Sequence, residues 1–503
     1  MERPYKVRHA TFVGIAAIAM SGIMLLLYII PSSPGALVPQ EWAMVLGWSV
    51  LGVVFFVASK LRYGEKFGTE VEVALDNELE ARSEARAKLD HAFEVALGDV
   101  RGASVAATTG AATQAAGCEI GDFSYFLPVN VEFGWGKSAE AGAVAARLGH
   151  RVLLVTGGNS VRKLGTLDRV RDSLLKAGLE CEVFGEVTPN PLTTTAQRGA
   201  DLARERGCDV VVGLGGGSVM DCAKAIAFMA RNDGDVNDYI FGRKSGDAAL
   251  PLVLIPTTCG TGSEGNGFAV LTNPDTGDKK SLRTNAIVAS ASIVDPQLMS
   301  TLPKKQLASV GFDALCHCIE AYTARRAQPL TDALALYAIG LISDNLVKLY
   351  REDDGTPDAE QDRAAWESMA IAATIGGMVI NTAGVTLAHG MEHPASGKRD
   401  IVHGQGLAAI EPVAVEASYR GDPVKFGVVS RLLGGYAAAD CADCLRGLLR
   451  DIGLDVRLSE LGVKEEDIPW MAENCFKVSA GNVENNPVVF DRAGVEDLYR
   501  KAM

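Results

Sequence analysis

Hydrophobic positions at the start of the chain form two long uncharged runs, residues 11–30 and 42–59. As helices, runs of this length reach roughly 27–30 Å, about the thickness of a bilayer's hydrocarbon core. The linker between them, PSSPGALVPQE, has three prolines and a glycine, which interrupt helices and favour turns. The pattern predicts a membrane anchor of two transmembrane helices within residues 1–64. A cleaved signal peptide is the alternative, and the second apolar run argues against it.

The basic residues around these runs predict their orientation. Three precede the first run, three follow the second and the linker has none; the six are Arg3, Lys6, Arg8, Lys60, Arg62 and Lys66. By the positive-inside rule, both ends of the hairpin and everything after it then lie in the cytoplasm.

The segment 65–117 changes character twice. Residues 65–100 are rich in charge and have apolar residues at a 3–4 spacing that Arg82 and Arg86 interrupt, so we expect a solvated helical stalk. Pairing of this helix between subunits is the weaker alternative. Residues 101–117 are small and nearly uncharged, which is typical of a flexible linker.

From residue 118 onward, apolar runs and helical patterns alternate. The apolar runs that predict strands are 151–157, 180–184, the start of 208–230, and 251–258. Strands that alternate with helices of 10–15 residues predict a parallel sheet covered by helices. Strand signals fade near residue 296 and helical periodicity follows. We therefore expect an α/β dinucleotide-binding domain over 118–295 and an α-helical metal-binding catalytic domain over 296–503.

A glycine-rich turn, GLGGGSVMD at 213–221, follows one of these strands and opens a helix. Backbone N–H groups and the helix dipole favour an anion at such a place. Ser218 is the expected N-cap, and Asp221 completes a capping box. A tight turn without a ligand is the alternative. The loop TTCGTGSEGNG at 257–267 lies at the end of another strand, where open α/β sheets bind ligands, so a nucleotide cofactor is favoured.

Net charge limits the partners. The chain carries a formal charge of −14, and the residues after 64 hold 43 basic against 60 acidic side chains. A surface this acidic excludes nucleic acid as an expected partner.

Histidines concentrate in two places. The chain has seven, and within residues 151–503 they are His317, His389, His393 and His403. Asp313 precedes His317 by four residues, and His389 precedes His393 by four, so each pair shares a helix face. One carboxylate with several imidazoles is typical of a site for a divalent transition metal. The spacing leaves open which of the five residues are ligands.

The motifs together identify a family. GGGSVMDCAKAIA, PTTCGTGSE, VDPQLMSTLP, GFDALCHCIEAY, the HGxxH-to-HG segment and NNPVVFDRAGVEDLY occur in this order, and residues 120–503 resemble the iron-containing (group III) alcohol dehydrogenases. The resemblance implies that Asp313, His317, His389 and His403 hold a divalent metal; Fe²⁺ is expected, and Zn²⁺ is the alternative. It makes His393 the pocket histidine near the nicotinamide and a candidate proton relay.

The resemblance also implies a cofactor site, and within the family the sequence looks most like the NADPH-dependent butanol dehydrogenase and aldehyde reductase branch. NAD-preferring relatives tend to carry an aspartate at the turn after the first strand, where Gly157 stands here. Without that carboxylate a ribose 2′-phosphate meets no repulsion, so we expect NADP(H) to be preferred over NAD(H). The expected cofactor-binding residues are Gly157, Gly158, Ser160, Gly215, Gly216, Gly217, Ser218, Asp221, Thr257, Thr258, Asn266 and Lys279.

The implied activity is hydride transfer between NAD(P)H and an aldehyde or primary alcohol polarised by the metal. A polyol or polyol-phosphate dehydrogenase of the same superfamily is one alternative, and an inactive membrane-tethered scaffold is another. The intact set of site residues argues against the scaffold. The resemblance further implies a homodimer or larger assembly.

Overall fold

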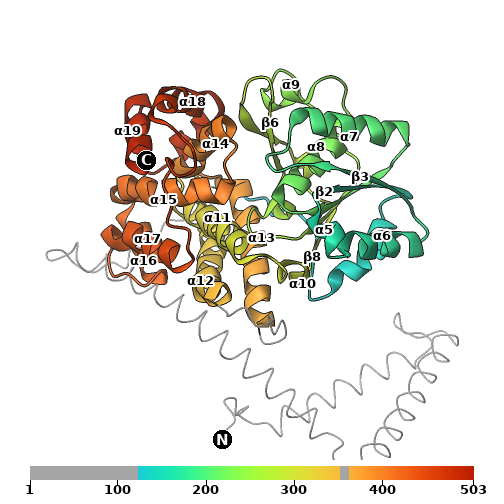
Figure 1. Cartoon of the computed structure of the whole chain (residues 1–503), viewed down its shortest axis with the longest axis horizontal. Helices are drawn as coiled ribbons and strands as arrows, with labels where there is room; N and C mark the ends of the chain where they lie inside the picture. The colour runs from blue at the N-terminus through green and yellow to red at the C-terminus, as the bar shows by residue number, and fades with distance from the viewer. Residues whose placement is uncertain (1–122, 352–361) are drawn as a thin grey trace, which may run out of the picture. The chain divides into compact units, whose positions relative to one another are not determined.

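The structure, a computed structural model, describes residues 123–351 and 362–503. These residues all belong to one of the two compact units into which the chain divides, Leu89–Met503. The predicted anchor (1–64) and the predicted stalk and linker (65–117) lie outside the described residues. Two parts are visible in Figure 1, a strand-containing part and a part made of helices.

The first part is built on a six-stranded sheet with the order β1-β8-β5-β4-β2-β3. Every neighbouring pair is parallel. The strands are β1 (Val131–Phe133), β2 (Arg151–Gly157), β3 (Glu180–Val187), β4 (Val210–Gly215), β5 (Leu252–Pro256) and β8 (Ala291–Val294). The predicted α/β class is confirmed.

Helices cover both faces of this sheet, which is why its central strands are apolar at successive positions. On β2, Val152 and Leu154 belong to the hydrophobic cluster of α4 (Ala141–Ala145) and α6 (Thr166–Lys176), while Leu153 and Val155 belong to that of α7 and α8. Figure 1 shows α6 on one side of the sheet and α7 (Thr193–Glu205) and α8 (Gly217–Met229) on the other. The short helices α5 (Ser160–Lys163) and α9 (Val236–Ile240) complete this part.

A two-stranded hairpin interrupts the α/β pattern. β6 (Phe268–Thr272) and β7 (Lys279–Arg283) pair antiparallel, with Thr272 opposite Lys279. Sequence analysis did not predict this hairpin. It places the predicted cofactor residue Lys279 at the start of β7, where that side chain is 5% exposed.

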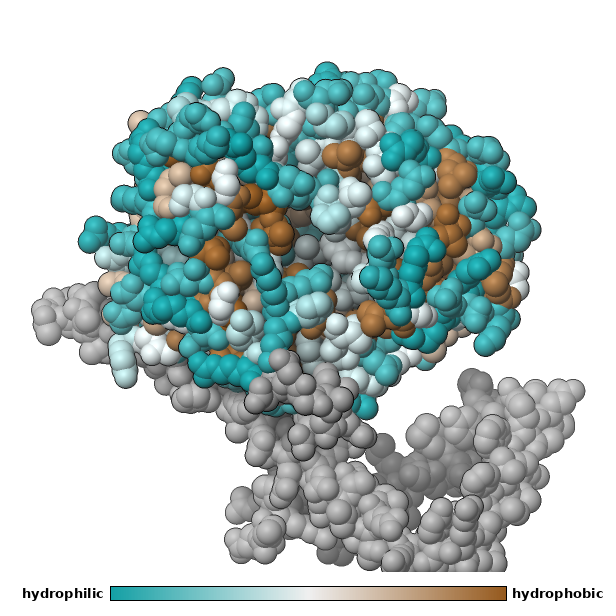
Figure 2. All heavy atoms as spheres, viewed as in Figure 1, coloured by the Kyte–Doolittle hydropathy of each residue, from teal (hydrophilic) through white to brown (hydrophobic). Residues whose placement is uncertain are grey.

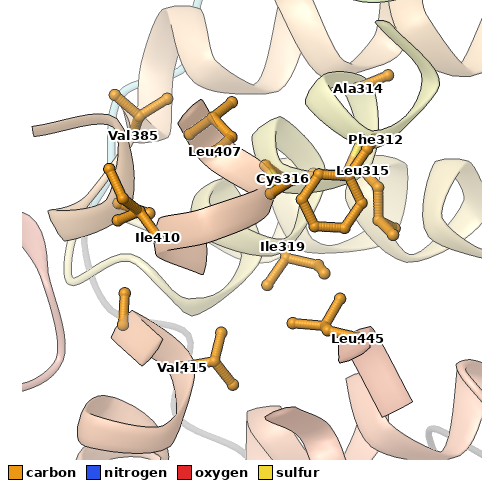
Figure 3. Packing of buried hydrophobic residues seen from close by; sticks show 14 of the residues in the cluster. Phe312, Ala314, Leu315, Cys316, Ile319, Val385, Leu407, Ile410, Val415 and Leu445 are labelled. Carbon is orange, nitrogen blue, oxygen red and sulfur yellow. The ribbon is translucent and has the colours of Figure 1, made fainter. Parts of the chain in front are cut away.

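Helices make up the second part, as predicted. They are α10 (Pro296–Met299), α11 (Lys304–Thr323), α12 (Pro329–Arg351), α13 (Arg363–Ala383), α14 (Leu387–Arg399), α15 (His403–Ser418), α16 (Pro423–Leu432), α17 (Cys441–Asp451), α18 (Ile468–Asn485) and α19 (Arg492–Ala502). Residues of α11 are buried almost continuously from Leu307 to Thr323, as expected for a central helix. Figure 3 shows its side chains Phe312 and Ile319 in the core with Ile410 of α15 and Leu445 of α17.

Within the described ranges, α12 is the one helix long and apolar enough to cross a membrane by length and composition alone; α13 and α14 would qualify only as one segment bent by 104°. α12 buries Ala335, Ile339, Ile342 and Leu346 in the core of the helical part. Its apolar composition is therefore accounted for by packing. On the face shown in Figure 2, hydrophilic residues cover most of the surface and hydrophobic ones form separate patches.

Candidate metal centre and cofactor cleft

Three neighbouring helices bring the candidate metal ligands together. Asp313 and His317 lie one turn apart on the buried helix α11, and His389 lies on α14. Gly384, at φ 75°, ends α13 in a conformation that favours glycine, and the chain then turns into α14. His403 is the first residue of α15.

Three ring nitrogens surround one carboxylate oxygen. Oδ1 of Asp313 lies 3.6 Å from Nδ1 of His317, 3.6 Å from Nε2 of His389 and 3.6 Å from Nε2 of His403. Two ligand atoms that each lie about 2.1–2.2 Å from a tetrahedral metal are about 3.5 Å apart. Each histidine nitrogen therefore lies as far from the Asp313 oxygen as a second ligand of one divalent cation would, and the ligand atoms of Asp313, His317 and His389 all lie within 4.8 Å of one another.

The atoms facing this point lack other partners. Asp313, His317 and His389 are 2%, 5% and 2% exposed. Asp313 Oδ1, His317 Nδ1 and His389 Nε2 have no hydrogen-bond partner among the described residues. Leaving buried polar atoms unpaired is costly, whereas a cation would satisfy all three at once. One carboxylate with three imidazoles suits Fe²⁺ and Zn²⁺, so the residues present fit the metal.

Burial and the charges of neighbouring groups shift the pKa values of the candidate ligands. Burial opposes ionisation of Asp313, but His317, His403 and His389 outweigh it and hold the pKa of this carboxyl below its usual range. Burial lowers the pKa of His317 to about 4. Burial acts in the same direction on His389, but Glu320 and Asp313 raise its pKa to about 10. Ligand imidazoles are neutral, so metal binding would release a proton from His389.

Two glutamates that were not predicted lie beside the outer nitrogens of His389 and His403. Glu320 contacts Nδ1 of His389, and Oε2 of Glu392 lies 2.5 Å from Nδ1 of His403. Carboxylates in such positions fix the tautomer and ring orientation of a metal-binding histidine. A signal was present: Glu320 and Glu392 each follow a histidine by three residues, which puts them on the ligand-bearing faces of α11 and α14.

His393 lies beside the four candidate ligands. Its ring centroid is 5.9 Å from that of His403 and 6.2 Å from that of His389. With Glu392 and His403 it forms a second group that could hold a cation. Burial, followed by the charge of Lys279, places the pKa of His393 well below its ordinary value. Burial and Lys279 thus favour the neutral form of His393, and its role as a proton relay remains a prediction.

A cavity with an empty volume of about 840 Å³ joins the metal centre to the predicted phosphate turn. It is lined by Gly217, Ser218, Asp221, Asn266 and Lys279 from the predicted cofactor set and by His317, His389, His393 and His403 from the metal region. The remaining predicted cofactor residues lie outside this lining, at or just after the carboxyl ends of β2, β4 and β5: Gly157, Gly158, Ser160, Gly215, Gly216, Thr257 and Thr258.

The predicted capping box at the phosphate turn is wrong. α8 begins at Gly217, and its N-cap is Gly216, which has no side chain to cap with. The carboxylate of Asp221 accepts hydrogen bonds from Ser263 Oγ at 2.6 Å and from the backbone N–H of Val270 at 2.9 Å. The hairpin and its preceding loop draw this side chain away from the end of the helix. Asp221 lines the cavity but has both oxygens engaged.

Close packing explains part of the glycine run. A Cβ on Gly217 would lie 2.3 Å from Cγ2 of Thr261, and one on Gly216 would lie 3.1 Å from Oγ1 of Thr258. Glycine is thus required by the approach of the two loops, independently of any ligand. Of the turn, Gly217 and Ser218 line the cavity.

A buried lysine, also missed by the sequence analysis, ties these loops together. Lys224 is 0% exposed, and its ammonium donates to Ser263 O at 2.5 Å, Ser263 Oγ at 2.8 Å, Asn266 Oδ1 at 3.0 Å and Phe268 O at 2.7 Å. Burial lowers its pKa to about 8, against the opposing charges of Asp221 and Glu264. Lys224 therefore positions Asn266 and the hairpin against α8.

Comparisons with known proteins match both parts of the chain. The family described as iron-containing alcohol dehydrogenase matches residues 128–296, and the C-terminal Fe-containing alcohol dehydrogenase family matches residues 307–503. A 1,3-propanediol dehydrogenase of Citrobacter freundii is 34% identical over 391 residues, which cover 76% of this chain and 98% of that protein. The NAD-dependent methanol dehydrogenase of Bacillus methanolicus is 31% identical, covering 76% and 100%.

Solved structures of alcohol dehydrogenases are similar to this chain. An archaeal halo-thermophilic alcohol dehydrogenase from a Red Sea brine pool superposes with a TM-score of 0.71 at 36% identity, covering 76% of this chain and 99% of that one. The NADH-dependent butanol dehydrogenase A of Thermotoga maritima gives 0.69 at 30% identity, covering 76% and 98%. Family membership implies a divalent metal, a nicotinamide cofactor and oxidoreductase activity on CH–OH groups. The two family models match both parts of the chain, and the structure brings the candidate metal ligands together. The chain therefore belongs to the iron-containing alcohol dehydrogenase family.

Proposed function

We propose that the chain reduces aldehydes to primary alcohols, and oxidises the alcohols in reverse, with NADP(H) preferred over NAD(H). Reduction moves a hydride from C4 of the nicotinamide to the carbonyl carbon and a proton to the carbonyl oxygen. The observation that carries the proposal is one cavity that holds both the predicted phosphate turn, Gly217 and Ser218, and the candidate ligands His317, His389 and His403.

The residues around the cavity have different roles in the proposed reduction. A divalent metal on Asp313 and the three histidines, Fe²⁺ in this proposal, supplies Lewis-acid polarisation of the substrate oxygen. The apolar side chains of Ile380 and Val385 line the cavity and keep water from part of its wall. His393 is neutral and borders the cavity, so it can pass a proton between the substrate oxygen and solvent.

Preference for NADP(H) is supported at the turn after β2. A Cβ on Gly157 would lie 2.6 Å from the carbonyl oxygen of Val187, so a carboxylate side chain there requires the backbone to shift. Nothing lies within 4 Å of a Cβ built on Gly158, which leaves space above the turn. Arg162 lies on α5, the helix that follows this turn, and its Nη2 lies 2.6 Å from the position that a Cβ on Gly185 of β3 would take. Arginine at this place suits a ribose 2′-phosphate.

Fluorescence titration of NADPH and NADH with the full chain tests this preference. We expect NADPH to bind at least about tenfold more tightly, and Arg162→Gln to remove most of that difference, since a charge-assisted bond to phosphate is lost. Arg492→Gln, on α19 and outside the cavity lining, is the matched control. Equal affinities for the two cofactors in the unmodified chain would contradict the preference. The NAD-dependent relatives make NAD(H) the alternative.

We further propose that residues 11–30 and 42–59 anchor the enzyme in a membrane, with the catalytic part in the cytoplasm. The support is the length of the two runs and the basic residues that flank them. If the proposal holds, the full chain stays in the membrane pellet after alkaline carbonate washing and is cleaved only by protease added from the cytoplasmic side. Release by carbonate would contradict the anchor.

A homodimer or larger assembly is also proposed. Phe123, Phe126 and Leu127 are 46%, 48% and 53% exposed, and exposed apolar side chains of this size favour association. Sedimentation of the detergent-solubilised full chain gives the test. A monomer at micromolar concentration would contradict the proposal.

A further inference from the structure

A second cavity opens beside His393, with an empty volume of about 800 Å³. One wall is the hairpin strand β7, which contributes Lys280, Ser281 and Arg283, and another is α18 with Ser479 and Asn482. Ser281, Arg283 and His393 line this cavity and the metal-containing cavity alike. The second cavity therefore leads to the place where the substrate would react.

The alternation of side chains along β7 puts Arg283 on the face that lines the metal-containing cavity. On β7, Lys279, Ser281 and Arg283 share a face, and all three line the metal-containing cavity. Lys279 has a counter-charge, since its ammonium lies 3.8 Å from Glu392. Arg283 has none: its guanidinium lies over the ring of Phe268, 4.7 Å from the centroid, and no carboxylate of the described residues is within ion-pair distance.

Lys280 adds a second uncompensated charge. Its ammonium lies 5.3 Å from the ring centroid of Phe241, and it too has no ion-pair partner in the described part of the chain. Burial and then the charge of Arg283 lower its pKa, while Asp278 acts in the opposite direction. Lys280 lies on the opposite face of β7 from Arg283, but both side chains line the second cavity, which therefore has two cations from this strand in its wall.

Among the residues that line the two cavities, few acidic side chains balance the charges of Arg283 and Lys280. Asp221 is the one carboxylate residue that lines either cavity among the described residues, and both of its oxygens already accept hydrogen bonds. The chain as a whole carries a charge of −14. A positive entrance on an acidic protein concentrates anionic ligands at that entrance.

We propose that the second cavity is the substrate entrance and that it selects aldehydes carrying an anionic group, carboxylate or sulfonate, at the end remote from the carbonyl. The inference rests on the proposed aldehyde reductase function. Arg283 would hold the anion through paired N–H donors, with Lys280 as the second cation. The carbonyl end would then lie toward His393 and the apolar wall of Ile380 and Val385.

A matched pair of substrates tests this selection. The metallated full chain is assayed with NADPH and either 4-oxobutanoate or butanal, which have the same number of carbons. We expect kcat/KM for 4-oxobutanoate to exceed that for butanal by at least about tenfold, since a charge-assisted pair is gained. Arg283→Gln should reduce the ratio toward one, Arg283→Lys should restore part of it, and Arg492→Gln should leave it unchanged. A ratio near one in the unmodified enzyme, or a ratio unmoved by Arg283→Gln, overturns the proposal.

Binding gives a readout that does not depend on turnover. The enzyme–NADPH complex is titrated with 4-hydroxybutanoate and with butan-1-ol, which cannot react with the reduced cofactor, and NADPH fluorescence is followed. Tighter binding of the anion that is lost in Arg283→Gln supports the proposal. Weaker binding of NADPH itself in that variant, to the same degree, would assign Arg283 to the cofactor and overturn it. If neither aldehyde is reduced, the proposed function fails, and this titration still decides whether the entrance selects anions.

Discussion

The carboxylate of Glu320 bridges Nδ1 of His389 and the start of the helix that carries this histidine. It contacts the imidazole and accepts a hydrogen bond from the backbone N–H of Thr386 at 2.6 Å. Nδ1 is thereby held on the side away from the centre, and Nε2 faces Asp313 at 3.6 Å. The relationship makes Glu320 a positioning residue for the metal.

We therefore expect Glu320→Gln to weaken metal binding about 10- to 100-fold while the fold is retained, because an amide does not hold the neutral histidine as the carboxylate does. Competition with a chromophoric chelator measures the affinity, and circular dichroism checks the fold. Glu411→Gln is a matched control. Burial and then the charge of Glu320 raise the pKa of Glu411 well above its ordinary value, so glutamine there resembles the protonated carboxyl that burial favours. Equal losses in the two variants would contradict the assignment.

The lowered pKa of Lys224 predicts that the free energy of unfolding depends on pH. Its pKa is lowered to about 8 in the folded chain, against about 10.4 for an unperturbed lysine. Between these values the unfolded chain binds more protons at this site, so its contribution to the free energy of unfolding rises with pH. Denaturant unfolding should show the destabilisation by Lys224→Met growing between pH 8 and pH 10.

Lys464 serves as the control for this prediction, because its side chain is 63% exposed. Lys464→Met should show no such growth. A cost of Lys224→Met that is constant across this pH range would mean that burial does not lower the pKa of Lys224.

Two glycines should respond in opposite ways to alanine. A Cβ on Gly404, next to the candidate ligand His403, would lie 2.1 Å from the backbone oxygen of Ser309 on α11. We expect Gly404→Ala to destabilise the fold by about 1–3 kcal/mol through this clash and to displace His403. Gly340→Ala on α12 meets nothing within 4 Å and should stabilise by roughly 0.5–1 kcal/mol. Thermal unfolding with and without metal compares them, and a stable, metal-binding Gly404→Ala chain would contradict the packing described.

Metal binding should also raise the melting temperature, because a ligand that binds only the folded state stabilises it. The increase should be clear for the unmodified chain and absent for Asp313→Asn, which replaces the carboxylate between the three histidines by an uncharged amide. A similar increase in this variant would place the metal elsewhere, for example on Glu392, His393 and His403.

The central strands were predictable because they are buried on both faces, which makes β2, β4 and β5 continuous apolar runs. β1 and β8 have three and four residues and give too short a signal. The hairpin β6–β7 mixes charge with apolar residues and depends on packing against α8. The family resemblance proposed the ligand set, and the structure brings these candidate side chains together. Glu320 and Lys224 act through contacts with residues 69 and 39 positions away in the chain, which local patterns do not encode. The capping box at Ser218 failed for the same reason.

Metal-dependent oxidation of NADPH is the decisive measurement for the proposed aldehyde reductase activity. The full chain is stripped of metal, reloaded with Fe²⁺ under anaerobic conditions or with Zn²⁺, and the absorbance of NADPH is followed with butanal and 4-oxobutanoate. We expect that NADPH is consumed only after metal is added and that His389→Ala abolishes the reaction. A folded, metallated chain that consumes neither NADPH nor NADH with any aldehyde, or turnover that survives removal of the metal, would contradict this expectation.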